Sequence, residues 1–394
     1  LRLLMDVLDP YSNAVESESD KSVSGSESSE HGGLTDEQIE STIRLLSQVI
    51  ESSPNDYQSR VQLIGLLRQH GDMENATLHR ETLTELFPLG ENIWLEWIED
   101  EERLASTESE FVTTATYERI DTLFRKATKD YLSIDVYLKW ADFIEKVMVE
   151  SLEAQQTETS RDAPHVGFDE VRSFYEEVTK HTMGHLSRGG EIWERYRAFV
   201  DMMASCLPES EQVECVRLKR TLFHRELENP HLNVAKMFAE TYMPWEEEIG
   251  GVQAPLNAGQ TEQIKRSFEQ SWMEVEARMS YEVDLQTLEE AYTDHHTPDY
   301  ERLEGLRRYI QFETTHANPN PSRIICLYER TLAMYFLVID IWQSYVQYLA
   351  KAPRSLSNSE ILDSLIAVQE RAIRNYPYTH HMWCQLMISL EKRK

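Results

Sequence analysis

The chain has 394 residues, more than one compact domain usually holds, and carries 69 acidic against 39 basic residues for a formal net charge of −30. This charge opposes the phosphate neutralisation that drives most nucleic-acid binding, so any RNA-facing surface has to be local. Hydrophobic residues, at 41%, are enough for a core, whereas no apolar stretch approaches the ~20 residues that cross a bilayer. We therefore expect a soluble protein without a membrane contact.

The chain holds four cysteines and no close CxxC pair among them: Cys206, Cys215, Cys326 and Cys384. Without a disulfide framework or a visible signal peptide, the sequence favours a reducing cytosolic or nuclear setting, with each cysteine a buried apolar side chain. The sequence begins at Leu1 and ends at Lys394, directly after a tryptophan-bearing segment. We therefore expect a part of a longer protein, with its array truncated at the C-terminus.

Residues 1–33 form an acidic, serine-rich segment that we expect to be disordered, because residues 12–33 offer almost nothing to bury against the entropy of ordering. Ser17 and Ser24 each have an acidic residue three positions on, as an acid-directed kinase requires. The alternative is an inert solvated tail.

Helical periodicity takes over from Leu34, with Thr35 and Gln38 forming a capping box. An apolar stripe follows, and we expect it to end before Pro54: Ile39, Ile43, Leu46 and Ile50. From there the pattern is helix, short turn, helix, repeated through about eight complete or partial pairs. Gly184, Gly189 and Gly190 indicate an insertion in one of the turns, with the flanking helices unchanged.

One helix of each pair carries two large side chains three positions apart, which places both on one face, one turn apart. The residues of this predicted repeat core are Trp94 and Trp97, Tyr137 and Trp140, Trp193 and Tyr196, Trp342 and Tyr345, and a weaker copy at Trp383. The partner helix carries an aromatic residue followed by charged and small residues. Such stripes are core far more often than ligand surface, so we assign them a structural role.

A direct repeat confirms the period of this pattern within the sequence. Residues 329–342 read ERTLAMYFLVIDIW, and residues 370–383, forty-one positions later, read ERAIRNYPYTHHMW. Periods of roughly 20 to 50 residues are typical of stacked arrays. We expect an all-α solenoid with one set of repeats over residues 34–250 and a second over residues 251–394, and a boundary or hinge within residues 244–260.

Catalytic chemistry has little support in the sequence. The phosphate-cradle, zinc-helix and nucleophile-elbow motifs are missing, so we expect no enzyme, no cofactor and no metal. His181 and His185 lie four apart without a third ligand, and the pairs at residues 295–296 and 380–381 fit exposed loops. The acidic run at residues 99–102 is expected to be a solvated face. Basic residues that could form a local RNA or partner patch, or ion pairs with carboxylates, are Arg217, Lys219, Arg220, Arg225, Arg302, Arg307 and Arg308.

The paired-aromatic helix followed by an aromatic helix with charged and small residues resembles the HAT (half-a-TPR) repeat of RNA-processing factors. Three stretches sharpen the resemblance, at residues 66–74 (LLRQHGDME), 85–101 (ELFPLGENIWLEWIEDE) and 370–383. They are similar to the family of the squamous cell carcinoma antigen recognised by T cells, a U4/U6 small nuclear ribonucleoprotein (snRNP) recycling factor. The resemblance implies a TPR-like, curved superhelix of antiparallel helix pairs.

The same resemblance implies a nuclear, non-enzymatic scaffold for pre-mRNA splicing, which docks protein partners on its concave face and in the grooves between repeats. Its implied partners are U4/U6 snRNP components and ubiquitin-specific peptidases, with homodimerisation in the full-length protein and little direct RNA contact by this chain. Two alternatives remain open: a HAT-repeat solenoid that binds RNA itself, and a scaffold of another RNA-processing complex, such as the one that cleaves mRNA 3′ ends.

Overall fold

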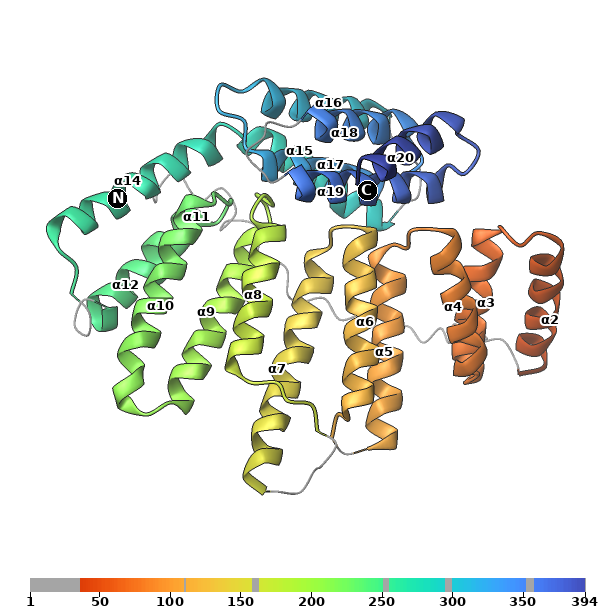
Figure 1. Ribbon diagram of the computed structural model, residues 1–394, viewed down its shortest axis with the longest axis horizontal. Coiled ribbons are helices and arrows are strands. Elements are labelled where there is room, and N and C mark those ends of the chain that lie inside the picture. Colours follow the sequence, from red (N-terminus) through yellow and green to blue (C-terminus); the bar gives the residue numbers. More distant parts are fainter. Residues whose placement is uncertain are drawn as a thin grey trace, which may run out of the picture. The chain divides into compact units, whose positions relative to one another are not determined.

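The computed structural model describes residues 36–109, 111–157, 163–250, 255–294, 300–351 and 358–393. Within these ranges every regular element is a helix (Figure 1). The expected disorder of residues 1–33, the serines at 17 and 24, the Thr35 cap and the histidines at 295–296 lie outside the described residues. The all-α array predicted from the aromatic spacing is confirmed.

The helices follow one another with short connections. Their bounds are α2 Asp36–Ser52, α3 Tyr57–His70, α4 Met73–Leu86, α5 Glu91–Glu108, α6 Thr114–Asp130, α7 Ile134–Thr157, α8 Phe168–Thr182, α9 Gly189–Cys206, α10 Glu209–Glu228, α11 Val234–Lys236, α12 Met243–Trp245, α14 Ala258–Glu276, α15 Met279–Asp294, α16 Tyr300–Thr315, α17 Pro321–Met334, α18 Ile339–Lys351, α19 Asn358–Asn375 and α20 His380–Arg393. Two π-helical turns, Met237–Tyr242 and Glu246–Gly250, flank α12.

Two compact units divide the chain, residues 1–76 and 77–394. In the first unit α2 packs on α3, and both contribute to a small core of Leu46, Ile50, Leu63, Leu67 and Ala76. Asp56 caps α3 by accepting from the Ser59 amide at 3.2 Å. At the other end Gly71 adopts a φ of 83°, the left-handed conformation that closes a helix and that glycine adopts most readily.

The second unit begins with upright helix pairs. Helices α5, α7 and α9 are neighbours and form one layer, called here the A-helices, while α6, α8 and α10 are the B-helices that alternate with them in sequence (Figure 1). Each pair exposes an apolar face that only the next pair covers, which is the physical basis of an array. Among the described helices, none is long and apolar enough to span a membrane.

In the later repeats α16 and α18 correspond to A-helices, and α15, α17 and α19 correspond to B-helices. At four places a ring stack joins a B-helix to the A-helix that follows it. The stacked pairs are Phe124 with Trp140 at 5.5 Å, Tyr175 with Tyr196 at 4.8 Å, Tyr281 with Tyr309 at 4.8 Å, and Tyr328 with Tyr345 at 4.8 Å between ring centroids. Offset-stacked rings contribute about 0.5–1.5 kcal/mol each beyond their buried area. The stacks therefore join consecutive helix pairs at a fixed register.

The region between residues 234 and 294 is the least regular part of the array. Its core cluster runs from Val216 to Val275, and a separate cluster contains Leu285 and most of the apolar side chains of α16–α20. Helix α14 packs on α10 and α11, whereas α15 packs on α16. The sequence pattern did not separate α15 as a helix of its own, although it supplies Tyr281 to the ring series. The domain boundary near residue 250 stays a prediction.

Candidate partner-docking groove

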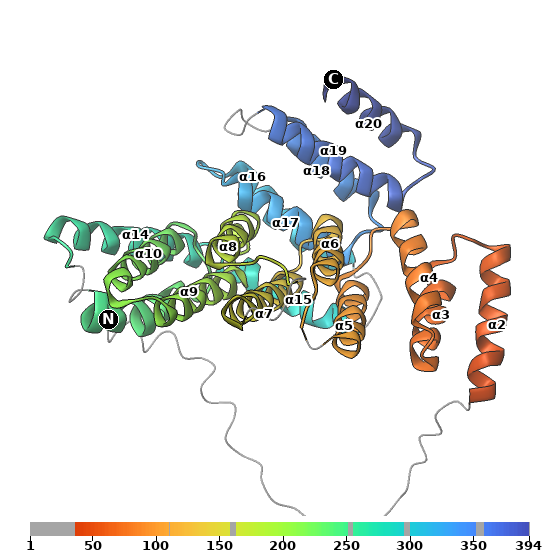
Figure 2. The ribbon, with the colours of Figure 1, turned by 60° about the horizontal axis from the view of Figure 1, so that its bottom comes forward.

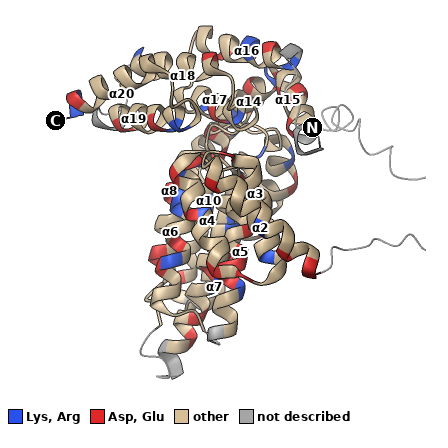
Figure 3. Cartoon of the chain, turned by 90° about the vertical axis from the view of Figure 1, so that its right-hand side faces the viewer, with Lys and Arg blue, Asp and Glu red and all other residues tan. Residues whose placement is uncertain are grey.

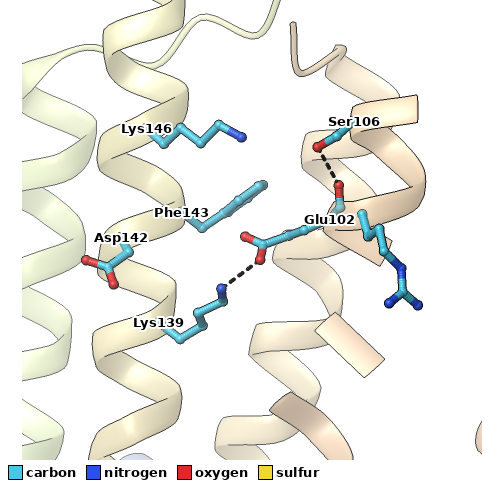
Figure 4. A pocket seen from close by; sticks show the side chains of 7 residues that line it. Glu102, Ser106, Lys139, Asp142, Phe143 and Lys146 are labelled. Atoms are coloured by element: carbon cyan, nitrogen blue, oxygen red, sulfur yellow. Dashed lines mark hydrogen bonds and ion pairs between the residues drawn. The ribbon is translucent and has the colours of Figure 1, made fainter. Parts of the chain in front are cut away.

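A recess on the second unit lies between two A-helices, α5 and α7. It has a volume of about 360 Å³, opens to the surface and is lined by Glu102, Arg103, Ser106, Lys139, Asp142, Phe143 and Lys146. In Figure 4 the Phe143 and Lys146 side chains extend from α7 toward α5, while Asp142 points away from the groove. Adjacent A-helices thus leave a groove between repeats, the kind of surface that the resemblance implies for partner docking.

Ion pairs neutralise most of the charges around this groove. Lys139 Nζ lies 2.8 Å from Glu102 Oε2, and Asp142 pairs with Arg195 of α9 at 2.7 Å. Burial opposes the charge of Lys139, yet the hydrogen bond to Glu102 raises the pKa of its ammonium above the usual value. Arg103 is held by Asp100 at 2.7 Å. These pairs leave Lys139, Asp142 and Arg103 neutralised by groups of the protein itself.

Among the cations that line the groove, Lys146 has the longest ion pair. Its side chain is 57% exposed, and its pair with Glu150 measures 3.8 Å, longer than a hydrogen bond. The buried ring of Phe143, stacked on Tyr117 at 6.1 Å between centroids, lies one turn away. The groove therefore offers an ammonium donor beside an aromatic floor.

Two exposed apolar residues adjoin this end of the groove. The Val112 amide donates to Glu150 Oε2 at 2.9 Å, which brings the α5–α6 connection against α7. Phe111, next to Val112, is 44% exposed, and Val149 of α7 is 40% exposed. An ammonium, an aromatic floor and two apolar neighbours suit a polypeptide segment with an acidic and an apolar side chain better than they suit a catalytic reaction.

The predicted repeat-core residues lie inside the array with one exception. Buried are Trp94, Trp97, Tyr137, Trp140, Trp193, Tyr196, Trp342 and Tyr345. Trp383 is 44% exposed, so its assignment to the core was wrong. In the preceding repeat Arg371 of α19 covers the ring of Trp342 at 5.7 Å, and the described chain has no helix after α20 to cover Trp383 in the same way.

The basic residues singled out in the sequence lie on two helices that are well separated in Figures 1 and 2, α10 and α16. On α10 the four pairs are Arg217 with Glu214 at 3.2 Å, Lys219 with Asp201 at 2.7 Å, Arg220 with Glu246 at 2.8 Å and Arg225 with Glu176 at 2.7 Å. Arg307 of α16 reaches Asp340 at 3.5 Å, Arg308 donates to the Glu304 carbonyl, and Arg302 is also engaged. Acidic and basic residues interleave along the helices (Figure 3).

Sequence reasoning missed a polar relay that accompanies the ring stacks. An A-helix tyrosine donates to a glutamate of the preceding B-helix, and an arginine of the following B-helix binds the same glutamate. The three relays are Tyr196–Glu176–Arg225, Tyr309–Glu282–Arg330 and Tyr345–Glu329–Arg371. In all three relays the signal is a glutamate directly after the B-helix tyrosine, in FYEE, SYEV and LYER. Burial raises the pKa of all three phenols, so they remain donors.

Two further expectations need correction. Cys206 and Cys384 are exposed, and only Cys215 and Cys326 are buried as predicted. The acidic run at residues 99–102 is not a solvated face throughout. Asp100 is fully buried against Arg80 at 2.6 Å, and Glu101 accepts from the indole of Trp97. Which carboxylates are buried depends on the helices that pack against them, and the sequence pattern of one helix does not contain that information.

The two histidines four positions apart, His181 and His185, are held by protein groups. The His181 ring lies 3.3 Å from the Tyr137 hydroxyl, and His185 is buried, with its Nδ1 accepting from the Arg188 amide at 3.2 Å. Burial and the nearby Arg330 hold the pKa of His185 well below its usual value. Across the residues that the structure describes, no three histidine, cysteine or acidic side chains gather as metal ligands would.

Comparison with known proteins gives a consistent result. The model of the suppressor of forked protein family matches residues 41–394. A spliceosome associated factor 3, U4/U6 recycling protein, from Mus musculus is 30% identical over 352 residues, which cover 89% of this chain and 31% of the relative. The Homo sapiens counterpart is 29% identical with 30% of its length covered, and that of Caenorhabditis elegans is 22% identical with 38% covered. The chain spans about a third of these relatives.

Proposed function

Because this chain belongs to the suppressor of forked family, we propose that it serves as a non-enzymatic HAT-repeat scaffold in U4/U6 snRNP assembly and recycling. The resemblance to U4/U6 recycling factors, read from the stretches at residues 66–74, 85–101 and 370–383, is confirmed by the similarity to spliceosome associated factor 3. Whatever lies in the remaining two thirds of such relatives, this part supplies a helical array and its grooves.

The observation that carries the proposal is the groove between α5 and α7. Its floor is fixed by ring stacking, and most of its charges are neutralised within the protein, so a partner meets a preformed surface. A preformed site lowers the entropic cost of binding. We infer that snRNP proteins dock here, with an acidic side chain of the partner near Lys146 and an apolar one over Phe143.

The cellular setting that follows from this function is the nucleus, where U4/U6 snRNPs are assembled. Ubiquitin-specific peptidases are further candidate partners of the array, and homodimerisation belongs to the full-length protein. Direct RNA binding by this chain is disfavoured, because the basic side chains of α10 are already paired with carboxylates and the chain carries a net charge of −30.

A pull-down from nuclear extract tests the proposal. The chain is used as bait with and without ribonuclease treatment, and bound proteins and U4 and U6 RNA are identified by mass spectrometry and hybridisation. We expect U4/U6 snRNP proteins to stay bound after the RNA is digested. Recovery of mRNA 3′-end cleavage factors alone would assign the chain to another RNA-processing complex, and a tight, steeply salt-dependent complex with naked snRNA in a filter-binding titration would make it an RNA-binding solenoid.

A further inference from the structure

Helix α19 contacts a turn that lies some 240 residues earlier in the chain. Arg374 Nη2 binds Asp130 Oδ1 at 2.6 Å, and Arg371 Nη1 donates to the Asp130 carbonyl oxygen at 2.6 Å. Asn375 Nδ2 donates to the Tyr131 hydroxyl at 3.3 Å. Asp130 and Tyr131 form the start of the α6–α7 turn, so α19 contacts the α5–α10 pairs at a turn.

The Asp130 carboxylate joins three helices at this point. Its Oδ2 accepts from the Leu89 amide at 2.9 Å and from the Trp94 indole at 3.0 Å, while its Oδ1 is left for Arg374. The residue is buried, and Arg371 also binds the relay glutamate Glu329 at 2.6 Å. A buried carboxylate with all its partners in place is costly to disturb, because losing one partner leaves an uncompensated charge.

A second contact lies at the next turn along, between α8 and α9. Gly184 approaches the first turn of α17 so closely that a Cβ atom on it would lie 2.2 Å from the Ser322 carbonyl oxygen. Arg330 Nη2 of α17 donates to the Ser187 hydroxyl at 3.0 Å. The three glycines that the sequence presented as a loop insertion thus include one whose missing side chain allows two backbones to meet.

We propose that Asp130, Gly184 and Arg374 form a latch that holds α15–α20 against the turns of the α5–α10 pairs and fixes the angle between the two sets of repeats. The two contacts lie on neighbouring turns and engage two B-helices, α19 and α17. Two separated points of attachment resist rotation as well as separation. Helix α14 packs on α10 and α11 whereas α15 packs on α16, so the short α14–α15 connection joins the two groups of helices, and a change in the angle between them requires the latch to open first.

The native cysteines allow a direct test. Cys206 of α9 and Cys384 of α20 are exposed and belong one to each of the two groups of helices that the latch joins, whereas Cys215 and Cys326 are buried. With spin labels on the two exposed cysteines, double electron–electron resonance should give one narrow distribution of the distance between the labels for the parent chain. Gly184→Ala should broaden it and move it to longer distances. Gly305→Ala in α16, where nothing lies within 4 Å of the new methyl group, should leave it unchanged.

If Gly184→Ala does not fold, a charge-reversal variant at Arg374 still tests the latch. Arg374→Glu places a carboxylate beside Asp130 and should broaden the distribution in the same way, while Arg393→Glu, in the exposed pair with Asp363, serves as the matched control. Far-ultraviolet circular dichroism verifies that each variant keeps its helices. A folded Gly184→Ala or Arg374→Glu chain with the parent's distance and width would overturn the latch.

Discussion

Trp342 shows how one side chain ties several helices of the array together. It is fully buried, its indole donates to the Phe336 carbonyl at 2.9 Å, and the Arg371 guanidinium lies 5.7 Å from its ring centre. Replacing a buried tryptophan by alanine removes the contacts and leaves a cavity, which costs about 3–5 kcal/mol. We expect Trp342→Ala to lower the free energy of unfolding by that amount in urea titrations followed by circular dichroism.

Trp383 is the matched control for this prediction, because it occupies the equivalent position of the next repeat and its indole donates to the Pro377 carbonyl in the same way. Its 44% exposure leaves far less buried area to lose, so Trp383→Ala should cost less than half as much. Equal losses in the two variants would contradict the account of the rings as the packing between repeats.

His231 gives the array a measurable dependence on pH. Burial and the nearby Arg197 lower the pKa of its imidazole to about 4, its Nε2 contacts Glu226 at 3.0 Å, and its Nδ1 has no partner among the described residues. Glu226 also binds Arg197, which leaves the carboxylate committed to two groups. Protonation would place a buried N–H without an acceptor, so the folded state keeps the ring neutral.

The direction in which His231 makes stability depend on pH follows from where each state binds the proton. The unfolded chain binds a proton at His231 near pH 6.5 and the folded chain only near pH 4, so the stabilisation is present above pH 6.5 and is lost as the pH falls through this window. From pH 7.5 to 5.0 the loss is about 2 kcal/mol. The stability difference between the parent and His231→Gln should shrink by that amount. A difference that is constant with pH would show that His231 does not titrate differently on folding.

At the scale of single residues, the sequence predicted the burial of aromatic side chains better than the burial of charged ones. Trp94, Trp193 and Trp342 were assigned to the core because three-residue spacing is visible within one helix. Glu282 and Arg330 were not, because a charged residue turns inward only when the neighbouring helices supply its partners. That information depends on which helix packs on which, and the spacing within one helix does not contain it.

Among the elements, helix α3 has two glycines in different roles, one inside the helix and one at its C-terminal end. Gly65 lies within the helix with nothing within 4 Å of a new Cβ, whereas Gly71 closes the helix with a φ of 83°. Alanine favours helix interiors by roughly 0.5–1 kcal/mol and is strained at positive φ by about 1–2 kcal/mol. We expect Gly65→Ala to raise the thermal midpoint of the chain and Gly71→Ala to lower it. Shifts of the same sign would show that the cap does not control this helix.

Most helices were predictable from the sequence because each carries a full apolar stripe and ends at a turn signal. Helix α2 ends at Ser52, just before Pro54, as the stripe predicted. Helix α15 was not separated, because its ring Tyr281 stands alone and its partner Tyr309 belongs to α16. The turn between α8 and α9 was identified as irregular, but the role of Gly184 depends on α17, which is distant in sequence.

At the scale of the second unit, the A-helices and B-helices have different tasks. Helices α17 and α19, which are B-helices, carry the contacts that join distant turns, while α5 and α7 present the groove. The predicted boundary near residue 250 lies in the chain between the groove helices and α17 and α19, so motion at that boundary would change the distance between the groove and α20. The latch and the boundary are therefore testable in the same chain.

The most direct test of the docking account is hydrogen–deuterium exchange of the chain with and without purified U4/U6 snRNP. We predict slower exchange on binding in α5 and α7, around residues 102–106 and 139–149, where the groove lies. A Lys146→Glu variant should lose this protection, and the Arg266→Glu variant of an exposed pair on α14 should keep it. Protection confined to residues 217–225 or 302–308, or no protection anywhere, would contradict docking at the groove.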